Sequence, residues 1–344
     1  MKKYTHNITI PGFTSRLART YLGGHSMAVL DLETTGLSAS RNQVILSGIV
    51  LPAEKTLLSP EPVPAEAIQF FAEDPSQERD VLLATMDILS DTDIIITYNG
   101  RSFDMPFLFR RADQYSIRHD LHAYDLDLFS VVSGYTDLKN VIGSLRQKNL
   151  EIFMGLSQQR QDEISGGDSV RMYQNYAAGK DPQLLRKILL HNHDDILQLA
   201  RLLPVIEKTD FHRAMYSLGF PAPAGTVRRL DLTASDFRIH FTAPSGQMMP
   251  DYISFPTESM PCQITASSAS GICEVNIPVE HIVRNVAVID AHRLLGDSVP
   301  ASLSSMPAYE SGYLVMNQAQ RLNYTEINAF VMEFLRRLDI FGLQ

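Results

Sequence analysis

Two acidic residues, Asp31 and Glu33, directly follow the short apolar run Met27–Leu30. An apolar run of this length predicts a buried strand, and residues i and i+2 of a strand share a face. The two carboxylates should therefore project side by side, where they repel each other. A shared proton or a divalent cation offsets such repulsion. The alternative, which applies to most lone acidic pairs, is a solvated strand end.

A third acid, Asp104, stands where a later strand gives way to a helix. The apolar run Ile94–Thr97 is followed by the turn pair Asn99-Gly100, and Asp104 comes four residues later. Apolar residues around Asp104 recur at helical spacing, which would hold its side chain in place. For Asp104 alone, the alternative is an ordinary helix N-cap.

A third polar group interrupts a long helix near the middle of the chain. Apolar residues recur at helical spacing from Ile188 to Leu203, and His191 and Asp195, four residues apart, share one face. His193 points elsewhere. Leucine and isoleucine flank the pair and should hold it near the core, where an unpaired charge is unfavourable. The alternative for this pair is a surface hydrogen bond.

The order and separation of these three motifs resemble those of the DEDD exonuclease superfamily, which has the ribonuclease-H-like fold. The resemblance is closest to the YprB-like branch of that superfamily. It covers about residues 27 to 206 and includes the segment Asp162–Val170. The residues that carry it are Asp31 and Glu33, then Asn99-Gly100 through Asp104 to Phe107, and finally His191, Asn192 and Asp195.

The resemblance implies a site in which Asp31, Glu33, Asp104 and Asp195 surround two divalent cations, Mg²⁺ or Mn²⁺. Hard cations prefer such oxygen ligands, and in a two-metal mechanism the ions lie roughly 4 Å apart. Asp31 is the candidate to bridge both ions. The implied activity is 3′–5′ exonucleolytic hydrolysis of RNA or single-stranded DNA.

His191 is the expected general base of this site, because an imidazole titrates near neutrality. The third motif departs from the superfamily pattern, since His191 stands at the spacing to Asp195 where tyrosine is usual.

Four further residues beside the motifs are candidate substrate contacts: Thr34, Asn99, Phe103 and Gly167. Gly167 belongs to a glycine-rich turn before an expected helix at 168–176, and backbone N–H groups at such a helix start can hold a phosphate. The alternative for Gly167 is that the glycines only permit a tight turn.

The length of 344 residues predicts two domains. We expect an N-terminal arm at 1–26, a ribonuclease-H-like exonuclease domain at 27–208 and an accessory α+β domain at 209–344. The first domain should be α/β, with a mixed β-sheet flanked by helices. In the last part, short β-like runs and an apolar helical stripe at 327–338 indicate strands and a helix, but no motif there indicates a function.

Hydropathy and cysteine content indicate the cellular compartment of the protein. No apolar run approaches the ~20 residues needed to cross a membrane, and none of signal-peptide length follows the basic start, so we expect a cytoplasmic protein. Two cysteines, Cys262 and Cys273, are expected as reduced thiols, although a disulfide stays open.

The net charge of −9 is unusual for a protein that binds phosphates. Cations at the carboxylates would offset part of it. Basic residues after the second motif, Arg101, Arg110, Arg111 and Arg118, would either line a substrate groove or form solvated helix faces.

Two other functions fit the same motifs: a structure-selective endonuclease, and a non-catalytic module that keeps the fold and binds nucleic acid or protein. All four acids are present, which favours an enzyme over a decayed site. Polymerase proofreading is a weaker alternative, because no polymerase-sized region accompanies the motifs. The sequence does not identify protein partners.

Overall fold

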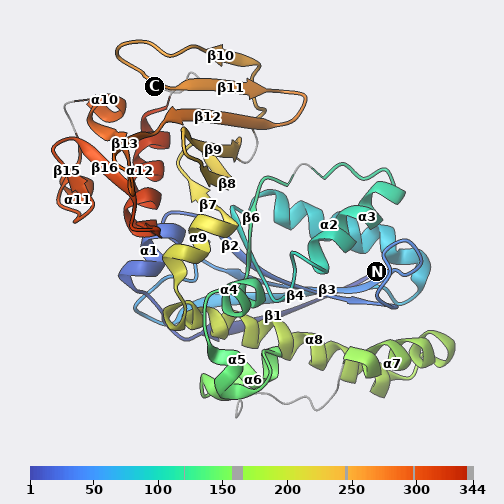
Figure 1. Ribbon diagram of the computed structural model, residues 1–344. Coiled ribbons are helices and arrows are strands. Elements are labelled where there is room, and N and C mark those ends of the chain that lie inside the picture. The colour runs from blue at the N-terminus through green and yellow to red at the C-terminus, as the bar shows by residue number, and fades with distance from the viewer. Residues whose placement is uncertain (120, 157–165, 245–246, 297–298, 339–344) are drawn as a thin grey trace. The chain divides into compact units, whose positions relative to one another are not determined.

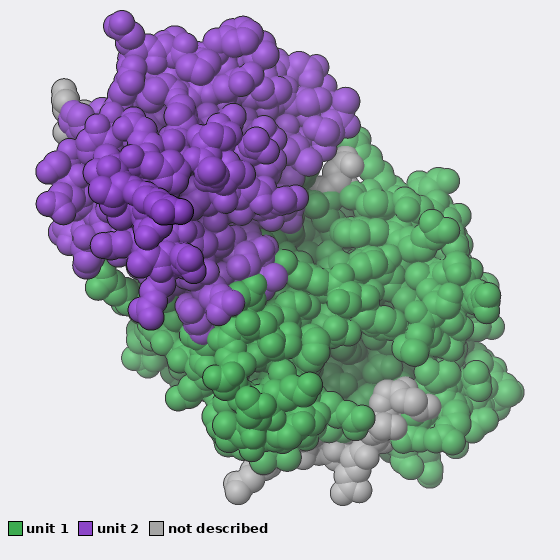
Figure 2. Space-filling model, viewed as in Figure 1, with its two compact units in different colours: residues 1–209 green, residues 210–344 purple. Residues whose placement is uncertain are grey.

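The structure is a computed structural model of the 344-residue chain. It describes residues 1–119, 121–156, 166–244, 247–296 and 299–338. The chain forms two compact units, residues 1–209 and residues 210–344, which are coloured separately in Figure 2. Residues 162–165 of the segment that resembles the YprB-like branch lie outside the described residues.

The described strands of unit 1 all lie within residues 2–127, interspersed with helices, and the described elements that follow are helical (Figure 1). Its strands are β1 (Lys2–Ile10), β2 (Met27–Thr34), β3 (Val44–Pro52), β4 (Val63–Phe71), β5 (Ile94–Thr97) and β6 (Tyr124–Asp127). Its α-helices are α1 (Arg16–Leu22), α2 (Glu78–Ser90), α3 (Asp104–Gln114), α4 (Leu128–Gly134), α5 (Leu138–Ile142), α6 (Gln147–Phe153), α7 (Gly166–Gly179) and α8 (Pro182–Leu202). Short 3-10 helices cover Pro75–Gln77 and Leu203–Lys208.

The strands of unit 1 form a six-stranded mixed sheet in the order β1-β4-β3-β2-β5-β6. β2 pairs with β3 antiparallel and with β5 parallel, as expected from a hairpin followed by a crossover through α2. Because β2 lies in the middle of the sheet, almost all of its residues are buried. A strand that is covered on both faces needs apolar side chains on both, which explains why Met27–Leu30 is continuously apolar.

Helices cover both faces of this sheet (Figure 1). On one face, α2 and α3 pack on a core that includes Leu30, Leu32 and Ile68. On the other face, α7 and α8 pack on a core that includes Leu46 and Phe71. The alternation of β2 thus sends its leucines towards α2 and α3, and its acids towards α8.

The first 26 residues, expected as an arm, contribute to unit 1. β1 is an edge strand that pairs antiparallel with β4 along its whole length, from Lys2 opposite Phe71 to Ile10 opposite Val63. Most of its side chains are exposed, so the strand lacks the apolar period that marks β2. Ser15 caps α1, because its side chain accepts a hydrogen bond from the N–H of Ala18.

Unit 2 contains two antiparallel sheets and four α-helices within its described residues. One sheet has the order β10-β11-β12-β9-β8-β7, and the other has the order β13-β14-β16-β15, with β17 paired to β16. The strands are β7 (Phe220–Ala222), β8 (Gly225–Leu232), β9 (Asp236–Thr242), β10 (Tyr252–Ser254), β11 (Gln263–Ser267), β12 (Ile272–Pro278), β13 (Glu280–Val283), β14 (Val286–Asp290), β15 (Tyr309–Glu310), β16 (Tyr313–Gln318) and β17 (Arg321–Leu322). The helices are α9 (Phe211–Leu218), α10 (Ala291–Leu295), α11 (Ala301–Ser304) and α12 (Tyr324–Arg337).

The expected fold class is confirmed: a mixed sheet flanked by helices, followed by a smaller α+β unit. The apolar stripe of α12 is core, since Ile327, Phe330 and Phe334 are buried. Cys262 and Cys273 are buried, free thiols. Within the described residues, no helix combines the length and apolar character needed to cross a membrane.

Candidate metal centre

The first two acids lie on β2 and share the face that α8 covers. Asp31 is paired across the ladder with Gly48 of β3, and Glu33 is paired with Leu46. Glu33 is 8% exposed, whereas Asp31 is half-buried. The predicted side-by-side arrangement follows from the strand period, because the intervening Leu32 belongs to the core under α2 and α3.

Helix α8 brings His191 and Asp195 to this face. Nε2 of His191 lies 3.4 Å from Oε1 of Glu33 and 3.5 Å from Oδ2 of Asp195. One donor atom from each of these three residues lies within 4.8 Å of the others, which is close enough to hold one metal ion. The pair therefore lies against the sheet, and its helical spacing of four residues gives both side chains one direction. His193, as expected, points elsewhere and lies edge-on to the ring of His6.

Asp104 reaches the site from the first turn of α3. Oδ1 of Asp104 accepts a hydrogen bond of 3.1 Å from the N–H of Leu32, between the two acids of β2. The pairing of β2 with β5 ends at Val29 opposite Ile96, so the N–H of Leu32 needs another acceptor. The N-cap position of α3 is Phe103, not Asp104, and it makes no side-chain cap. Asp104 thus completes the hydrogen bonding of β2.

The acids of this site strongly perturb one another. The pKa of Glu33 is raised to about 8: burial is the largest cause, the charges of Asp31 and Asp195 contribute in the same direction, and His191 acts in the opposite direction. Burial and the charge of Asp31 also raise the pKa of Asp104 well above its usual range, although the Leu32 N–H opposes them. Such a set stays partly protonated or requires a compensating cation.

The donor set fits hard divalent cations. Carboxylate oxygens are the preferred ligands of Mg²⁺ and Mn²⁺, and imidazole suits Mn²⁺ less well than it suits softer metals. Glu33, His191 and Asp195 form one compact cluster. Asp31 and Asp104 adjoin it, since the charge of Asp31 acts on both Glu33 and Asp104.

The candidate substrate residues have structural roles of their own. Oγ1 of Thr34 donates to the carbonyl oxygen of Gly36, at the turn after β2. Asn99 has a φ of 67°, and its N–H donates to Oδ1 of Asp127. Phe103 packs against Phe107, with ring centroids 5.4 Å apart.

Gly167 lies in the first turn of α7, which the structure assigns to Gly166–Gly179. Substrate contact by Thr34, Asn99, Phe103 and Gly167 stays a prediction.

Arg111 and Arg101, two basic residues near the second motif, contact other parts of the fold. Arg111 forms a buried ion pair with Glu78 of α2. The guanidinium of Arg101 donates to the carbonyl oxygen of Asp125 and lies 5.2 Å from the ring centroid of Tyr124. Arg110, in contrast, has an exposed side chain.

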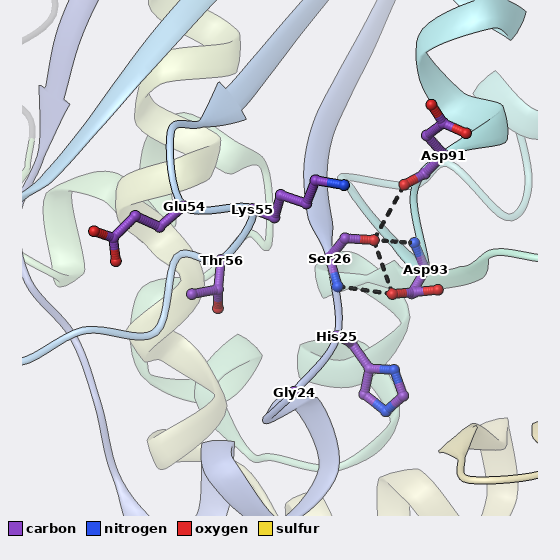
Figure 3. A pocket seen from close by; sticks show the side chains of 8 residues that line it. All are labelled: Gly24, His25, Ser26, Glu54, Lys55, Thr56, Asp91 and Asp93. Carbon is purple, nitrogen blue, oxygen red and sulfur yellow. Dashed lines mark hydrogen bonds between the residues drawn. The ribbon is translucent and has the colours of Figure 1, made fainter.

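A hollow of about 450 Å³ lies elsewhere on unit 1 (Figure 3). It is lined by residues that precede β2 and β5, including His25, Ser26 and Asp93, whereas the acids stand near the other end of β2. Asp93 accepts hydrogen bonds from both the N–H and the hydroxyl of Ser26, as Figure 3 shows. Ser26 and Asp93 thus bind each other, and the hollow is separate from the carboxylates.

Two residues of this region, Gly48 and Gln69, were missed in the sequence as parts of the site, and Asn192 was named only as a member of the third motif, without a role. Asn192 Nδ2 donates a hydrogen bond of 2.9 Å to Oδ2 of Asp31, and Gln69 Nε2 donates one of 2.8 Å to Oδ1 of Asn192. Both amides are buried. For Gln69, an amide between the apolar residues Ile68 and Phe70 was the available signal, because burial of an unpaired amide is unfavourable.

Comparison with known proteins agrees with this architecture. The sequence profile of the RNase H superfamily matches residues 28–206, more than half of the 344 residues. A search of curated proteins gave no match.

Among solved structures, the family B DNA polymerase from the hyperthermophilic archaeon Pyrobaculum calidifontis is similar at 14% identity, with a TM-score of 0.41. That match covers 90% of this chain and 42% of the polymerase, and a likeness at this level carries no argument about activity. The profile match spans β3 to β6 and nearly all of β2, both helical layers and all five candidate site residues, and on that basis the chain belongs to the RNase H superfamily.

Proposed function

We propose that the protein is a divalent-metal-dependent nuclease that hydrolyses phosphodiester bonds of nucleic acid. In its finer form, the proposal is a 3′–5′ exonuclease that acts on RNA or single-stranded DNA. The observation that carries it is the clustering of Glu33 from β2 with His191 and Asp195 from α8, more than 150 residues later in the chain, beside Asp31 and Asp104. Membership of the RNase H superfamily supports it. The exonuclease polarity rests on the resemblance to DEDD enzymes.

In this proposal the four carboxylates of Asp31, Glu33, Asp104 and Asp195 hold two cations, Mg²⁺ or Mn²⁺. Bound there, such cations activate an attacking water and stabilise the leaving oxygen of the phosphodiester. Asp104 keeps its carboxylate beside β2 through the Leu32 N–H. Glu33 must lose its proton before it can bind a cation, since burial and Asp31 favour its neutral form.

His191 is the proposed general base. Its Nε2 faces Glu33 and Asp195, so a water held beside these carboxylates lies within reach of that atom. A neutral imidazole can take a proton at Nε2 near neutral pH. The same atom is close enough to the carboxylates to act as a metal ligand instead. The metal affinity and the cleavage rate of the variant His191→Ala distinguish a general base from a metal ligand.

The decisive experiment incubates the purified protein with 5′-labelled RNA and DNA oligonucleotides in Mg²⁺, Mn²⁺ or chelator. A ladder that shortens from the 3′ end, and that a blocked 3′ end abolishes, is the expected result. Cleavage of a circular single strand would indicate the endonuclease. Binding without cleavage under every metal condition would indicate the non-catalytic module.

A further inference from the structure

On the face of the unit 1 sheet that α8 covers, the side-chain amide of Asn192 fills the space left by a glycine, Gly48. Asp31 of β2, Gly48 of β3 and Gln69 of β4 are direct partners across the ladders, so these three positions share a face. Gly48, in the centre, has no side chain. Asn192 of α8 occupies the space above it and bridges the two outer residues, Asp31 and Gln69.

The hydrogen bonds fix which way the Asn192 amide faces. Gln69 Nε2 is a donor, and it binds both Oδ1 of Asn192 at 2.8 Å and the carbonyl oxygen of Leu189 at 2.9 Å. An amide oxygen only accepts, so Oδ1 must face Gln69 and Nδ2 must face Asp31. Nδ2 then donates to Oδ2 of Asp31 at 2.9 Å. Gln69 and Asn192 are 1% and 0% exposed, so water does not compete for these bonds.

Gly48 is required for this arrangement. A Cβ atom added at Gly48 would lie 2.2 Å from Oδ1 and 2.7 Å from Nδ2 of Asn192. Both distances are shorter than real Cβ contacts, so the buried side chain of Asn192 would have to leave the position in which it bonds to Asp31 and Gln69. The absence of a side chain at Gly48 is therefore what admits the amide to the sheet.

We propose that Asn192 is a positioning residue that holds the carboxylate of Asp31 in the orientation needed to bind divalent cations, with Gln69 fixing the amide from behind. This inference rests on the proposed function. The donor is a neutral amide, so it orients the carboxylate of Asp31 and leaves its negative charge for the metal. A lysine or arginine at this place would neutralise that charge. Hydrogen-bond partners of metal ligands commonly contribute 10- to 100-fold to metal affinity.

The test replaces Asn192 with leucine and measures Mn²⁺ binding by titration calorimetry, together with the metal dependence of cleavage. Asn192→Leu should weaken Mn²⁺ binding about 10- to 100-fold. Its cleavage rate should recover towards the wild-type rate at high Mn²⁺, because all metal ligands remain. A role confined to fold stability would instead change the melting temperature and leave the Mn²⁺ affinity unchanged.

Gln198→Leu is the matched control. Gln198 is a fully buried amide on the same helix, and neither polar atom of its side chain has a hydrogen-bond partner among the described residues. This change should leave Mn²⁺ affinity within about twofold of wild type, since it removes no bond to a metal ligand.

A second variant, Gln69→Leu, keeps Asn192 and frees its amide to rotate. It should weaken Mn²⁺ binding less than Asn192→Leu does, and the double variant should bind no more weakly than Asn192→Leu alone. Wild-type Mn²⁺ affinity in both single variants, while the wild-type protein binds Mn²⁺ and cleaves, would overturn the role of Asn192 only. A wild-type protein that neither binds Mn²⁺ nor cleaves would overturn the proposed function itself.

Discussion

The imidazole of His191 faces the second acid of β2, with Nε2 3.4 Å from Oε1 of Glu33. This pair joins the strand motif to the helix motif across about half of the chain's length. Each partner is buried, so the protonation state of one acts strongly on the other. The pH dependence of the metal-free protein should therefore report on this site.

The stability of the metal-free protein should fall as the pH rises from about 4.5 to about 8. The pKa of Glu33 is raised from 4.5 to about 8, so the folded state binds more protons than the unfolded state within this window. Stability decreases with pH wherever the folded state holds the extra proton. The raised pKa of Asp104 acts in the same direction. Melting temperatures in chelator across this pH range measure the effect.

Glu33→Gln is the control for this prediction, because a neutral amide cannot titrate. The variant should lose much of the decrease between pH 4.5 and pH 8. If wild type and variant had parallel melting profiles, Glu33 would not have the raised pKa described above.

Asp31→Ala should abolish divalent-dependent hydrolysis. The change removes the carboxylate that acts on both Glu33 and Asp104 and that accepts from Asn192. Initial rates with 5′-labelled oligonucleotides in Mg²⁺ and Mn²⁺ measure the loss. Asp87→Ala, on an exposed position of α2, is the matched control and should cleave normally. Full activity of the Asp31 variant would end the metal-site assignment.

His191→Ala should lower the cleavage rate about 10²- to 10⁴-fold, the usual contribution of a general base. Single-turnover rates at saturating Mn²⁺ give the size of the loss, and calorimetry gives the metal affinity. An unchanged affinity with a slow rate assigns the base to Nε2 of His191. An affinity that falls along with the rate assigns His191 as a metal ligand.

Arg111→Met should destabilise the protein by about 3–5 kcal/mol, because it leaves the charge of Glu78 buried without its ion-pair partner. Glu78 is fully buried, and it also accepts from the N–H of Val44 and the hydroxyl of Tyr115. The free energy of unfolding in urea measures the change. Arg110→Met, at the exposed neighbouring position, should change this free energy by less than about 0.5 kcal/mol. Equal stability of the two variants would contradict a structural role for the Glu78–Arg111 pair.

The local parts of the site follow from residue periodicity. Strand alternation predicts that Asp31 and Glu33 share a face, and the helical period predicts the same for His191 and Asp195. The structure contains both pairs on the expected elements. The parallel pairing of β2 with β5 was also predictable, because a helix connects the two strands.

The long-range parts could not be predicted in the same way. The hydrogen bond from Gln69 to Asn192 joins positions 123 residues apart. It depends on the register of β2, β3 and β4 and on where α8 packs against the sheet. This register cannot be predicted from the local sequence of the three strands. Asp104 was expected at the site, but its bond with the N–H of Leu32 could not be foreseen, because it depends on where the ladder between β2 and β5 stops. The exposed side chains of β1 show no apolar period, so the sequence gives no signal that this edge strand joins the sheet.

The close approach of Asn192 to Gly48 also constrains how related sequences can diverge. In a relative with a side chain at position 48, an asparagine at position 192 could not occupy the place that it has here. The carboxylate that corresponds to Asp31 would then need a different hydrogen-bond donor to orient it. Positions 48 and 192 should therefore change together across the family, although they are 144 positions apart in the chain (192 minus 48). Where asparagine is retained at 192, the opposing strand position should remain glycine.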